Sequence, residues 1–485
     1  MIIEPHTPVL VGVGSVEQTL DEPGAGLDDA GLLVAAARAA VDDAGVPGGS
    51  VDWIASTRGL TNPTNPADHL AHELGAAART VAATAGIPQQ TLLNLAFEGI
   101  RSGEIGVAIV GGADAKRRAD VARRAGVELA APPAGNAPDV DLTPTGEIVA
   151  RPEIEVGAVA PVQQYALIEN ARRPAHGWSI DEHLDDIAGL WSSMNTVAQT
   201  NPRAAFGAPM DATAIRETRP GNRLLAWPYN KWHNSQWAVD QSAALVITSA
   251  ARADELGVPR DRWVFPHVAL ESSQSLSLSR RRDLHRWPAM GVLGDRVAEQ
   301  LGRPVAEFDH VELYSCFPAA VRVQQAELGL DGDRVPTLSG GMAFAGGPFN
   351  NFVYQSTVPM IERLRVEPGT FGLVTVVSGL LTKPGLTVWS TEPPAEPMLV
   401  DDLVDAATDA TPVVPLDEAP QGSGRVASYT VVPVDDAPAR VVAIVDLDRG
   451  ERAVAAVEDA VVGAEAIRSD LIGTPVAVDG RRLVV

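Results

Sequence analysis

The sequence of 485 residues is long enough for one or two large domains, or for three of about 150 residues each. It contains 38 Lys and Arg against 62 Asp and Glu, and the formal net charge of −24 repels nucleic-acid phosphates and anionic lipid surfaces. Hydrophobic residues make up 45% and charged residues 21%, which excludes wholesale disorder and fibrous classes. We therefore expect a folded protein that binds neither nucleic acid nor membranes.

Cys316 is the only cysteine, so an internal disulfide and a zinc ribbon are both excluded. The first residues lack a basic segment followed by an apolar run, and no apolar stretch approaches the ~20 residues of a membrane helix. These observations predict a cytoplasmic protein without a metal or a permanently bound cofactor.

Strand and helix patterns alternate in the first part of the chain. Strands are expected at residues 9–13, 51–57 and 105–110, and helices at 28–44 and 88–103. The first helix has an Asp28 cap and a Gly45 stop, which are typical helix boundaries. Such alternation predicts a mostly parallel sheet covered by helices.

The same order returns after residue 242. Strands are expected at 243–248, 262–270, 311–314 and 372–377, and helices at 249–256, 290–301, 318–328 and 350–365. The chain therefore predicts a duplicated α/β unit, with one half at 1–116 and the other at 242–392.

Two further regions lack this alternation. Residues 117–241 are rich in Pro, Trp and Asn, and we expect a loop domain that lies over the sheet as a lid or ligand-binding subdomain and then returns to the sheet. Residues 393–423 have the composition of a linker. The β-branched runs of residues 424–485, separated by Gly, Pro and Asp, predict a small β-barrel of the OB type. Its acidic composition argues against nucleic acid as its ligand.

The order and spacing of several short sequence motifs, given at the end of this paragraph, resemble those of the thiolase superfamily over about residues 5–392. Members of that superfamily have two fused α/β halves with an inserted loop domain and act on CoA thioesters. The resemblance implies the layered α-β-α-β-α thiolase fold. The phrases are IRSGE at 100–104, VGGAD at 110–114, SAA at 242–244, SAARADELG at 249–257 and GGMAFAGGP at 340–348.

The positions that carry the chemistry of this superfamily are changed. The nucleophilic cysteine would fall near Gly86, the histidine of the Gly-His-Pro phrase at Gly347, and the late cysteine near Val377. The Asn-Glu-Ala-Phe phrase becomes Tyr-Ser-Cys-Phe at 314–317. We therefore expect no acyl transfer through a cysteinyl enzyme.

The Tyr-x-Cys-Phe phrase is similar to that of thiolase-like proteins related to sterol-carrier-protein thiolases, which also lack these cysteines. Some of those proteins work with a small OB-fold partner and cleave a β-hydroxyacyl-CoA by retro-aldol chemistry, with tyrosines moving protons. Residues 424–485 resemble that partner fused in place, without its zinc-ribbon cysteines.

Tyr314 and Cys316 are the catalytic candidates. Tyr314 follows a strand and precedes a helix, where site residues of open α/β sheets lie, and its phenol could transfer a proton. Cys316 is a nucleophile only if its thiol is activated. The alternatives are a packed tyrosine and a small core residue. Gly346 and Gly347 allow a ligand to approach the backbone, so their amides could polarise a thioester; Asn350 beyond them is a ligand contact or a helix cap.

Four more residues are candidates for contacts with CoA. The resemblance places Ser235 beside the pantetheine arm, with His233 next to it. Arg223 could bind a phosphate, and Lys383 could bind substrate, although an exposed lysine on a loop is the alternative.

The resemblance implies an acetyl-CoA acetyltransferase-like protein with acyl-CoA as substrate or ligand, in lipid or sterol metabolism. A retro-aldol lyase for β-hydroxyacyl-CoA and a non-catalytic acyl-CoA-binding scaffold are the alternatives. The resemblance also implies a homodimer through residues 79–85, unless the appended domain covers that surface.

Overall fold

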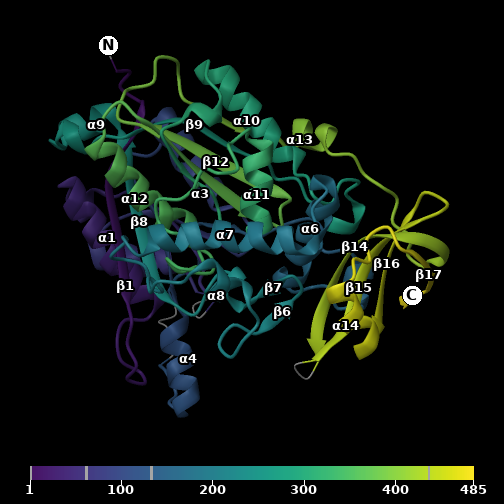
Figure 1. Cartoon of the computed structure of the whole chain (residues 1–485). Coiled ribbons are helices and arrows are strands. Elements are labelled where there is room, and N and C mark those ends of the chain that lie inside the picture. The colour runs from purple at the N-terminus through teal and green to yellow at the C-terminus, as the bar shows by residue number, and fades with distance from the viewer. Residues whose placement is uncertain (1–2, 61–63, 131–134, 435–436) are drawn as a thin grey trace.

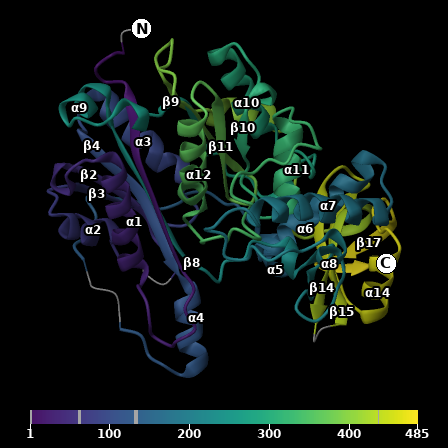
Figure 2. The ribbon, with the colours of Figure 1, turned by 60° about the vertical axis from the view of Figure 1, so that its left-hand side comes forward.

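The computed structural model of the chain describes residues 3–60, 64–130, 135–434 and 437–485. Two α/β bodies stand side by side, and a small barrel lies beyond the second body (Figures 1 and 2). The predicted α/β fold with duplicated halves and a C-terminal barrel is confirmed.

The first sheet has six strands in the order β1-β8-β4-β2-β3-β5. β8 pairs antiparallel with β1 on one side and with β4 on the other. The boundary predicted at residue 242 is therefore wrong, because the strand at 240–249 completes the first sheet instead of opening the second half. Sequence alone shows a strand here but not its neighbours. The bounds are β1 (Pro8–Gln18), β2 (Trp53–Thr57), β3 (Arg79–Ala83), β4 (Val107–Ala115), β5 (Val140–Leu142) and β8 (Asp240–Ser249).

The free edge of β3 is covered within the chain. β5 pairs in parallel with residues 81–83 of β3. Residues 79–85 were expected to form a dimer, and part of that strand already has a hydrogen-bonded neighbour.

The second sheet has the order β10-β11-β12-β9-β13. Its last strand belongs to the segment predicted as a linker, where residues 399–402 pair in parallel with β9 and a short helix follows. The prediction of a linker at 393–423 is thus wrong for these elements, because pairing with a sheet edge overrides a Pro-rich composition. The bounds are β9 (Phe265–Glu271), β10 (His310–Glu312), β11 (Phe371–Ser378), β12 (Lys383–Ser390), β13 (Leu399–Asp402) and α13 (Val404–Ala410).

Helices form three layers around the two sheets. The middle layer, α3 and α12, contacts both sheets, while α1 covers the outer face of the first sheet and α10 covers that of the second. α1 has the predicted caps, since the Asp28 side chain accepts from the Gly31 amide and Gly45 adopts φ +67°. The bounds are α1 (Asp29–Ala44), α2 (Pro66–Leu74), α3 (Gln89–Ser102), α9 (Ala250–Glu255), α10 (Pro288–Leu301), α11 (Pro318–Glu327) and α12 (Phe352–Val366).

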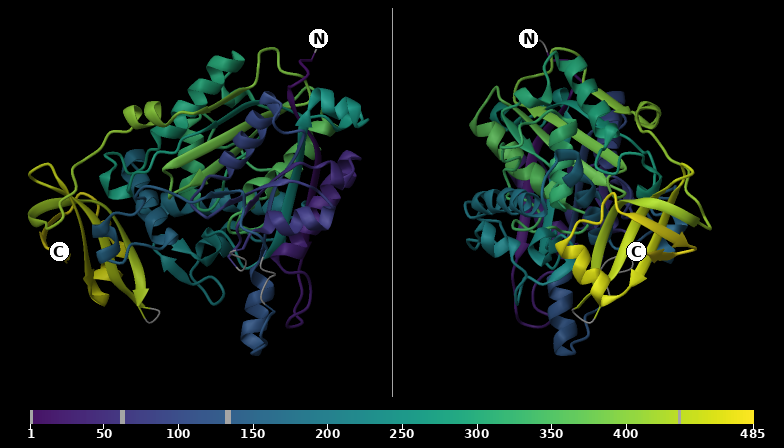
Figure 3. Two further views of the ribbon diagram at one scale, coloured as in Figure 1. Left: turned by 180° about the vertical axis from the view of Figure 1, so that it is seen from behind. Right: turned by 45° about the vertical axis from the view of Figure 1, so that its right-hand side comes forward.

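The inserted region is more helical than its sequence suggests. Its helix α6 is buried along Gln164–Arg173 without a polar stripe, so the amphipathic period that identifies a surface helix is missing. A second helix, α4, projects from the body (Figure 3). The bounds are α4 (Lys116–Ala125), α5 (Arg151–Glu155), α6 (Pro161–His176), α7 (Ile180–Ala198), α8 (Ala212–Arg216), β6 (Leu224–Ala226) and β7 (Tyr229–Asn230).

The C-terminal region is a closed barrel in the order β14-β15-β16-β18-β17. α14 connects β16 to β17, and valine, alanine and Tyr429 fill the interior. The small β-barrel that the sequence predicts is thus confirmed, and it has five strands. The bounds are β14 (Gln421–Val434), β15 (Ala437–Leu447), β16 (Arg452–Glu458), α14 (Ala460–Arg468), β17 (Pro475–Asp479) and β18 (Arg482–Val484).

Within the described ranges, we find no helix that combines the length and the apolar character needed to cross a bilayer.

Candidate functional site

A cleft of about 890 Å³ opens between the inserted region and the strand ends of the second sheet. Its size is within the ~300–1,000 Å³ of small-molecule sites, and its walls are mainly apolar. The end of β11, the segment after β10 and helix α6 all contribute to it. An elongated ligand with an apolar part can therefore be enclosed here.

Six of the candidate residues line this one cleft, although they are far apart in sequence. Topology brings them together because loops that follow neighbouring strands meet at one sheet edge. They are Arg223, Ser235, Tyr314, Cys316, Gly347 and Val377.

Tyr314 is held by its backbone on both sides. Its amide donates to Thr375 Oγ1 at 2.8 Å and its carbonyl accepts from Gln324 Nε2 at 2.9 Å. The ring contacts Phe352 edge-to-face with centroids 5.6 Å apart. The phenol therefore has a fixed direction at the cleft wall.

Burial keeps the protic groups of the site neutral. It raises the pKa of the Tyr314 phenol well above its usual range. It also raises the pKa of the Cys316 thiol to about 12, although a hydrogen bond with Tyr165 acts in the opposite direction. At neutral pH both groups are proton donors, and Cys316 lacks the thiolate character that a nucleophile needs.

Tyr165 is a third protic residue of the cleft that the sequence analysis missed. It lies on α6, and its ring stacks on Phe317 with centroids 4.4 Å apart. Burial and then the neighbouring Cys316 raise its pKa, whereas the charge of Arg281 lowers it. The chain has five tyrosines, and Tyr165 lies in the inserted region that was expected to cover the site. That position was the signal in the sequence that could have identified Tyr165 as a site residue.

The glycine loop has a packing role that the sequence did not reveal. A Cβ on Gly347 would lie 1.9 Å from Ser235 Oγ, so no side chain fits beside that serine. The Gly347 amide donates to the Gln236 carbonyl at 3.1 Å, and the Ser235 amide donates to the Cys316 carbonyl at 3.0 Å. The expected role of the Gly347 amide in polarising a thioester is therefore wrong, because that amide already has an acceptor. Gly346 adopts φ +107° but does not line the cleft.

Buried Glu312 anchors the start of the same loop. Its carboxylate accepts from the Leu338 amide at 2.6 Å and from the Ser339 amide at 2.9 Å, and two hydroxyls complete the set. Burial raises its pKa to about 7, while these hydrogen bonds lower it. The loop is thus fixed from behind, away from the cleft.

His233 and Asn350 lie behind the cleft wall. His233 is buried, its Nδ1 accepts from the Asn230 amide at 2.9 Å, and burial lowers its pKa to about 4, so the ring is neutral. Asn350 is also buried, and its amide donates to Asp114 Oδ2 at 3.3 Å. The N-cap of α12 is Asn351 rather than Asn350, because the helix starts at Phe352, one residue later than a cap at Asn350 requires. Neither candidate lines the cleft.

Lys383 and Gly86 contact each other outside the cleft. Lys383 Nζ donates to the Gly86 carbonyl at 3.2 Å, and burial lowers the pKa of the lysine. The expectation of an exposed lysine is wrong, because Lys383 begins β12, which the sequence analysis did not identify.

The turn between β11 and β12 forms another part of the wall. Gly379, Leu380 and Leu381 have φ of 62°, 61° and 58°, and the first two line the cleft. Within the described part of the chain, the amides of Gly379 and Leu380 have no hydrogen-bond acceptor. These two amides can donate to a ligand in the cleft.

The mouth of the cleft combines aromatic and basic side chains. Trp237 is 50% exposed and Phe349 39% exposed, both at the lining. Arg223 and Lys231 also line it, and Lys116 Nζ lies 4.7 Å from the centroid of the Trp237 ring. Lys116 pairs with Asp120 at 2.7 Å, so Arg223 and Lys231 are the basic side chains that line the cleft of this strongly acidic protein.

A buried ionic cluster supports the cleft from below. Glu169 accepts from the Tyr229 hydroxyl at 2.7 Å, contacts His183 Nε2 at 2.9 Å and pairs with Arg172. Burial alone would raise the pKa of Glu169, but Arg172 and these hydrogen bonds lower it to about 2. Tyr229 in turn stacks on Phe317, so the cluster fixes the floor of the site.

Among the described side chains, no group of three or more His, Cys, Asp or Glu is placed to hold a metal ion.

The fold is similar to those of solved thiolase-type structures. A monomeric SCP2-thiolase-like protein type 1 from Mycobacterium smegmatis matches with a TM-score of 0.85 and 26% identity over 100% of both chains. A structure described as an Ltp2-ChsH2(DUF35) aldolase matches 81% of this chain and 100% of its own with a TM-score of 0.61 and 19% identity. The acetyl-CoA acetyltransferase of Syntrophomonas wolfei matches 80% of this chain and 100% of its own with a TM-score of 0.56 and 16% identity.

No protein-family profile and no curated protein sequence matches the chain. The first of the three structures matches over the full length, so the likeness includes the C-terminal barrel.

Proposed function

Because the chain has the SCP2-thiolase-like fold of the thiolase superfamily, we propose that it binds acyl-CoA and makes or breaks the carbon–carbon bond next to the thioester. The observation that carries the proposal is the cleft itself, where Tyr314, Cys316 and Ser235 meet under a basic, aromatic mouth. A pantetheine arm is long and largely uncharged, which suits the mainly apolar walls of the cleft. The CoA phosphates suit Arg223 and Lys231.

The chemistry uses neutral donors rather than a thiolate. Burial holds the Tyr314 phenol and the Cys316 thiol in their protonated forms, so each can donate to an oxygen that gains negative charge. A dry wall strengthens such donation, since the local dielectric is low. The amides of Gly379 and Leu380 supply further donors for the thioester oxygen, in the role that Gly347 cannot take.

Cleavage of a β-hydroxyacyl-CoA is the direction we favour. The β-hydroxyl gives its proton to the Tyr314 phenol oxygen as that phenol passes its own proton to a solvent water in the open cleft. The Cα–Cβ bond breaks in the same step, and the bonding pair moves through Cα to the thioester oxygen as an enolate. Amide donors stabilise that oxygen, and Cα then takes a proton back from the solvent to give the shortened acyl-CoA and a ketone or aldehyde. In the reverse direction, the Tyr314 phenol protonates the new β-oxygen.

A panel of acyl-CoA substrates tests this function. We expect calorimetric binding of CoA, and release of a carbonyl product from at least one β-hydroxyacyl-CoA. Tyr314→Phe should lower turnover at least about a hundredfold, the usual contribution of one proton-transfer group. Tyr429→Phe, in the barrel interior, is the matched control and should keep the wild-type rate. Wild-type turnover by Tyr314→Phe would contradict the assignment.

A non-catalytic acyl-CoA-binding scaffold is the second candidate. The high pKa of Cys316, the only cysteine, favours it, because no thiol in the chain is activated for thiolase chemistry. CoA binding without any product from condensation, thiolysis or cleavage assays would support this candidate.

A further inference from the structure

The turn at the cleft wall has a backbone conformation that needs external support. Leu380 and Leu381 both adopt the left-handed conformation, with φ of 61° and 58°. Bulky side chains rarely adopt it, and two such residues in succession persist only where surrounding contacts hold them. The conformation of this turn therefore depends on contacts from other segments of the chain.

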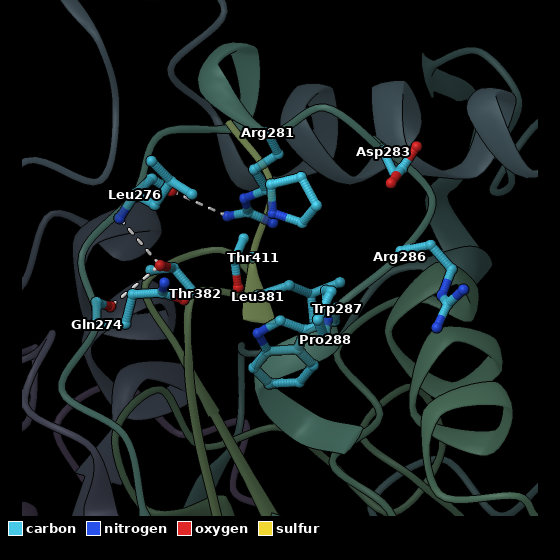
Figure 4. A pocket seen from close by; sticks show the side chains of 11 residues that line it. Gln274, Leu276, Arg281, Asp283, Arg286, Trp287, Pro288, Leu381, Thr382 and Thr411 are labelled. Carbon is cyan, nitrogen blue, oxygen red and sulfur yellow. Dashed lines mark hydrogen bonds between the residues drawn. The ribbon is translucent and has the colours of Figure 1, made fainter. Parts of the chain in front are cut away.

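Arg281 supplies the holding contact. Its Nη2 donates to the Leu380 carbonyl at 2.8 Å. The same nitrogen donates to the Leu276 carbonyl at 3.2 Å, and the Leu276 amide donates to Thr382 Oγ1 at 3.0 Å (Figure 4). The Arg281 guanidinium thus contacts Leu380 within the turn. Leu276 contacts Thr382, the residue between the turn and β12.

The Arg281 guanidinium is enclosed by the protein. Arg281 is buried, and burial lowers its pKa to about 10, so it stays a cation at neutral pH. The cavity beside it has a volume of about 10 Å³, which is too small for an organic ligand. Its hydrogen bonds go to backbone carbonyls, which indicates a positioning role.

The barrel holds Arg281 in turn. Arg452 on β16 is buried, and its guanidinium donates to the Arg281 carbonyl and, at 3.2 Å, to the Arg282 carbonyl. Its Nε pairs with Asp446 Oδ1 at 2.7 Å within the barrel. The connecting chain reinforces the junction, because the Arg282 amide donates to the Pro412 carbonyl at 2.9 Å.

A second set of contacts links the barrel to the opposite wall. Ser428 Oγ donates to the Leu167 carbonyl at 2.5 Å, and Asn170 Nδ2 donates to the Tyr429 carbonyl at 2.7 Å. Both partners on the body belong to α6, the helix that carries Tyr165. The barrel therefore contacts the supports of two walls of the cleft.

We propose that Arg281 is a positioning residue for the cleft, that it fixes the Gly379–Leu381 turn through the Leu380 carbonyl, and that the C-terminal barrel sets its place through Arg452. The barrel then acts as a built-in brace of the site. The link to catalysis rests on the proposed function, but the brace itself does not.

Hydrogen exchange of the full-length protein tests the brace without any ligand. In Arg452→Met and Arg281→Met, the amides of the strand ends that flank the turn, residues 376–378, Lys383 and Gly385, should exchange about tenfold faster or more. α10 should exchange at the wild-type rate. Arg425→Met is the matched control, since Arg425 is an exposed barrel arginine whose side chain, among the described residues, hydrogen-bonds to the Gly473 carbonyl and to no group of the body.

Arg281→Lys is the variant to use if Arg281→Met does not fold. It keeps the charge and can still donate to a carbonyl, so it should restore most of the protection. Unchanged exchange of these strand ends in Arg452→Met would overturn the role of the barrel. Unchanged exchange in the folded Arg281 variant would overturn the clamp.

Kinetics separates positioning from mere stability. On a substrate that the wild type turns over, Arg452→Met should lower kcat about tenfold with KM within about twofold, and Arg425→Met should change neither. Equal loss in both variants would contradict positioning. If the wild type binds no CoA and turns over no substrate, the proposed function fails, while the exchange result still decides on the brace.

Discussion

Adding a side chain at Gly347 tests whether Ser235 fills the space that a histidine would occupy at this position. A Cβ at this position meets Ser235 Oγ at 1.9 Å, Ser235 Cβ at 3.2 Å and Met342 Cβ at 3.3 Å. Gly347 is not in the left-handed region, so the cost of Gly347→Ala is steric rather than conformational.

The magnitude follows from these three contacts. Overpacking a closed site costs about 1–3 kcal/mol, and we expect about 2 kcal/mol for Gly347→Ala, since the serine hydroxyl can rotate only at some cost. In a Ser235→Ala background the shortest contact is gone and the two near 3.2 Å remain. The cost should fall to about 1 kcal/mol, a coupling of about 1 kcal/mol between the two positions.

Urea unfolding of the two single variants and the double variant, monitored by hydrogen exchange of residues 340–350, measures the coupling. Gly189→Ala is the control, because Gly189 lies within α7 with no atom within 4 Å of an added Cβ, and this change should stabilise by up to about 1 kcal/mol. Equal costs of Gly347→Ala in both backgrounds, within about 0.3 kcal/mol, would refute the steric explanation.

Three further predictions concern the buried polar groups. Glu169→Gln should lower the free energy of unfolding by about 3 kcal/mol in urea titrations, because it removes the closer carboxylate of buried Arg172 and leaves that charge only Asp186, at 3.8 Å. The pKa of Glu312 is about 7 in the folded chain and 4.5 is its ordinary value, so the folded state binds the extra proton between these pH values. The free energy of unfolding should therefore fall by up to about 3 kcal/mol as pH rises from about 4.5 to about 7. Urea titrations of the wild type and of Glu312→Gln at each pH should show this fall in the difference between their free energies of unfolding. A difference that does not change with pH would contradict the raised pKa of Glu312. Cys316, with a pKa of about 12, should resist iodoacetamide in the native protein at pH 8 and react at the rate of a free thiol in urea, as mass spectrometry can show; rapid native alkylation would refute its neutral state.

The sequence by itself determined the features that depend on local chemistry. An Asp cap and a Gly stop delimit α1, because the side-chain acceptor and the left-handed terminal residue act within a few positions. The alternating β-branched runs beyond residue 424 were sufficient for a small barrel, since the strand period needs no knowledge of distant partners. Tyr314 was found in the same way, as a residue between a strand and a helix.

Tertiary structure decided the features that depend on a distant partner. β8 completes the first sheet although it follows the inserted region, because pairing with β1 and β4 cannot be deduced from the strand's own residues. α6 is buried nearly all round, so its sequence has no amphipathic period, and Tyr165 was overlooked with it. The absence of a side chain at Gly347 looked like lost chemistry, and only the position of Ser235 shows that the space is filled from another segment. Close packing between residues remote in sequence is set by the whole fold, and no local pattern records it.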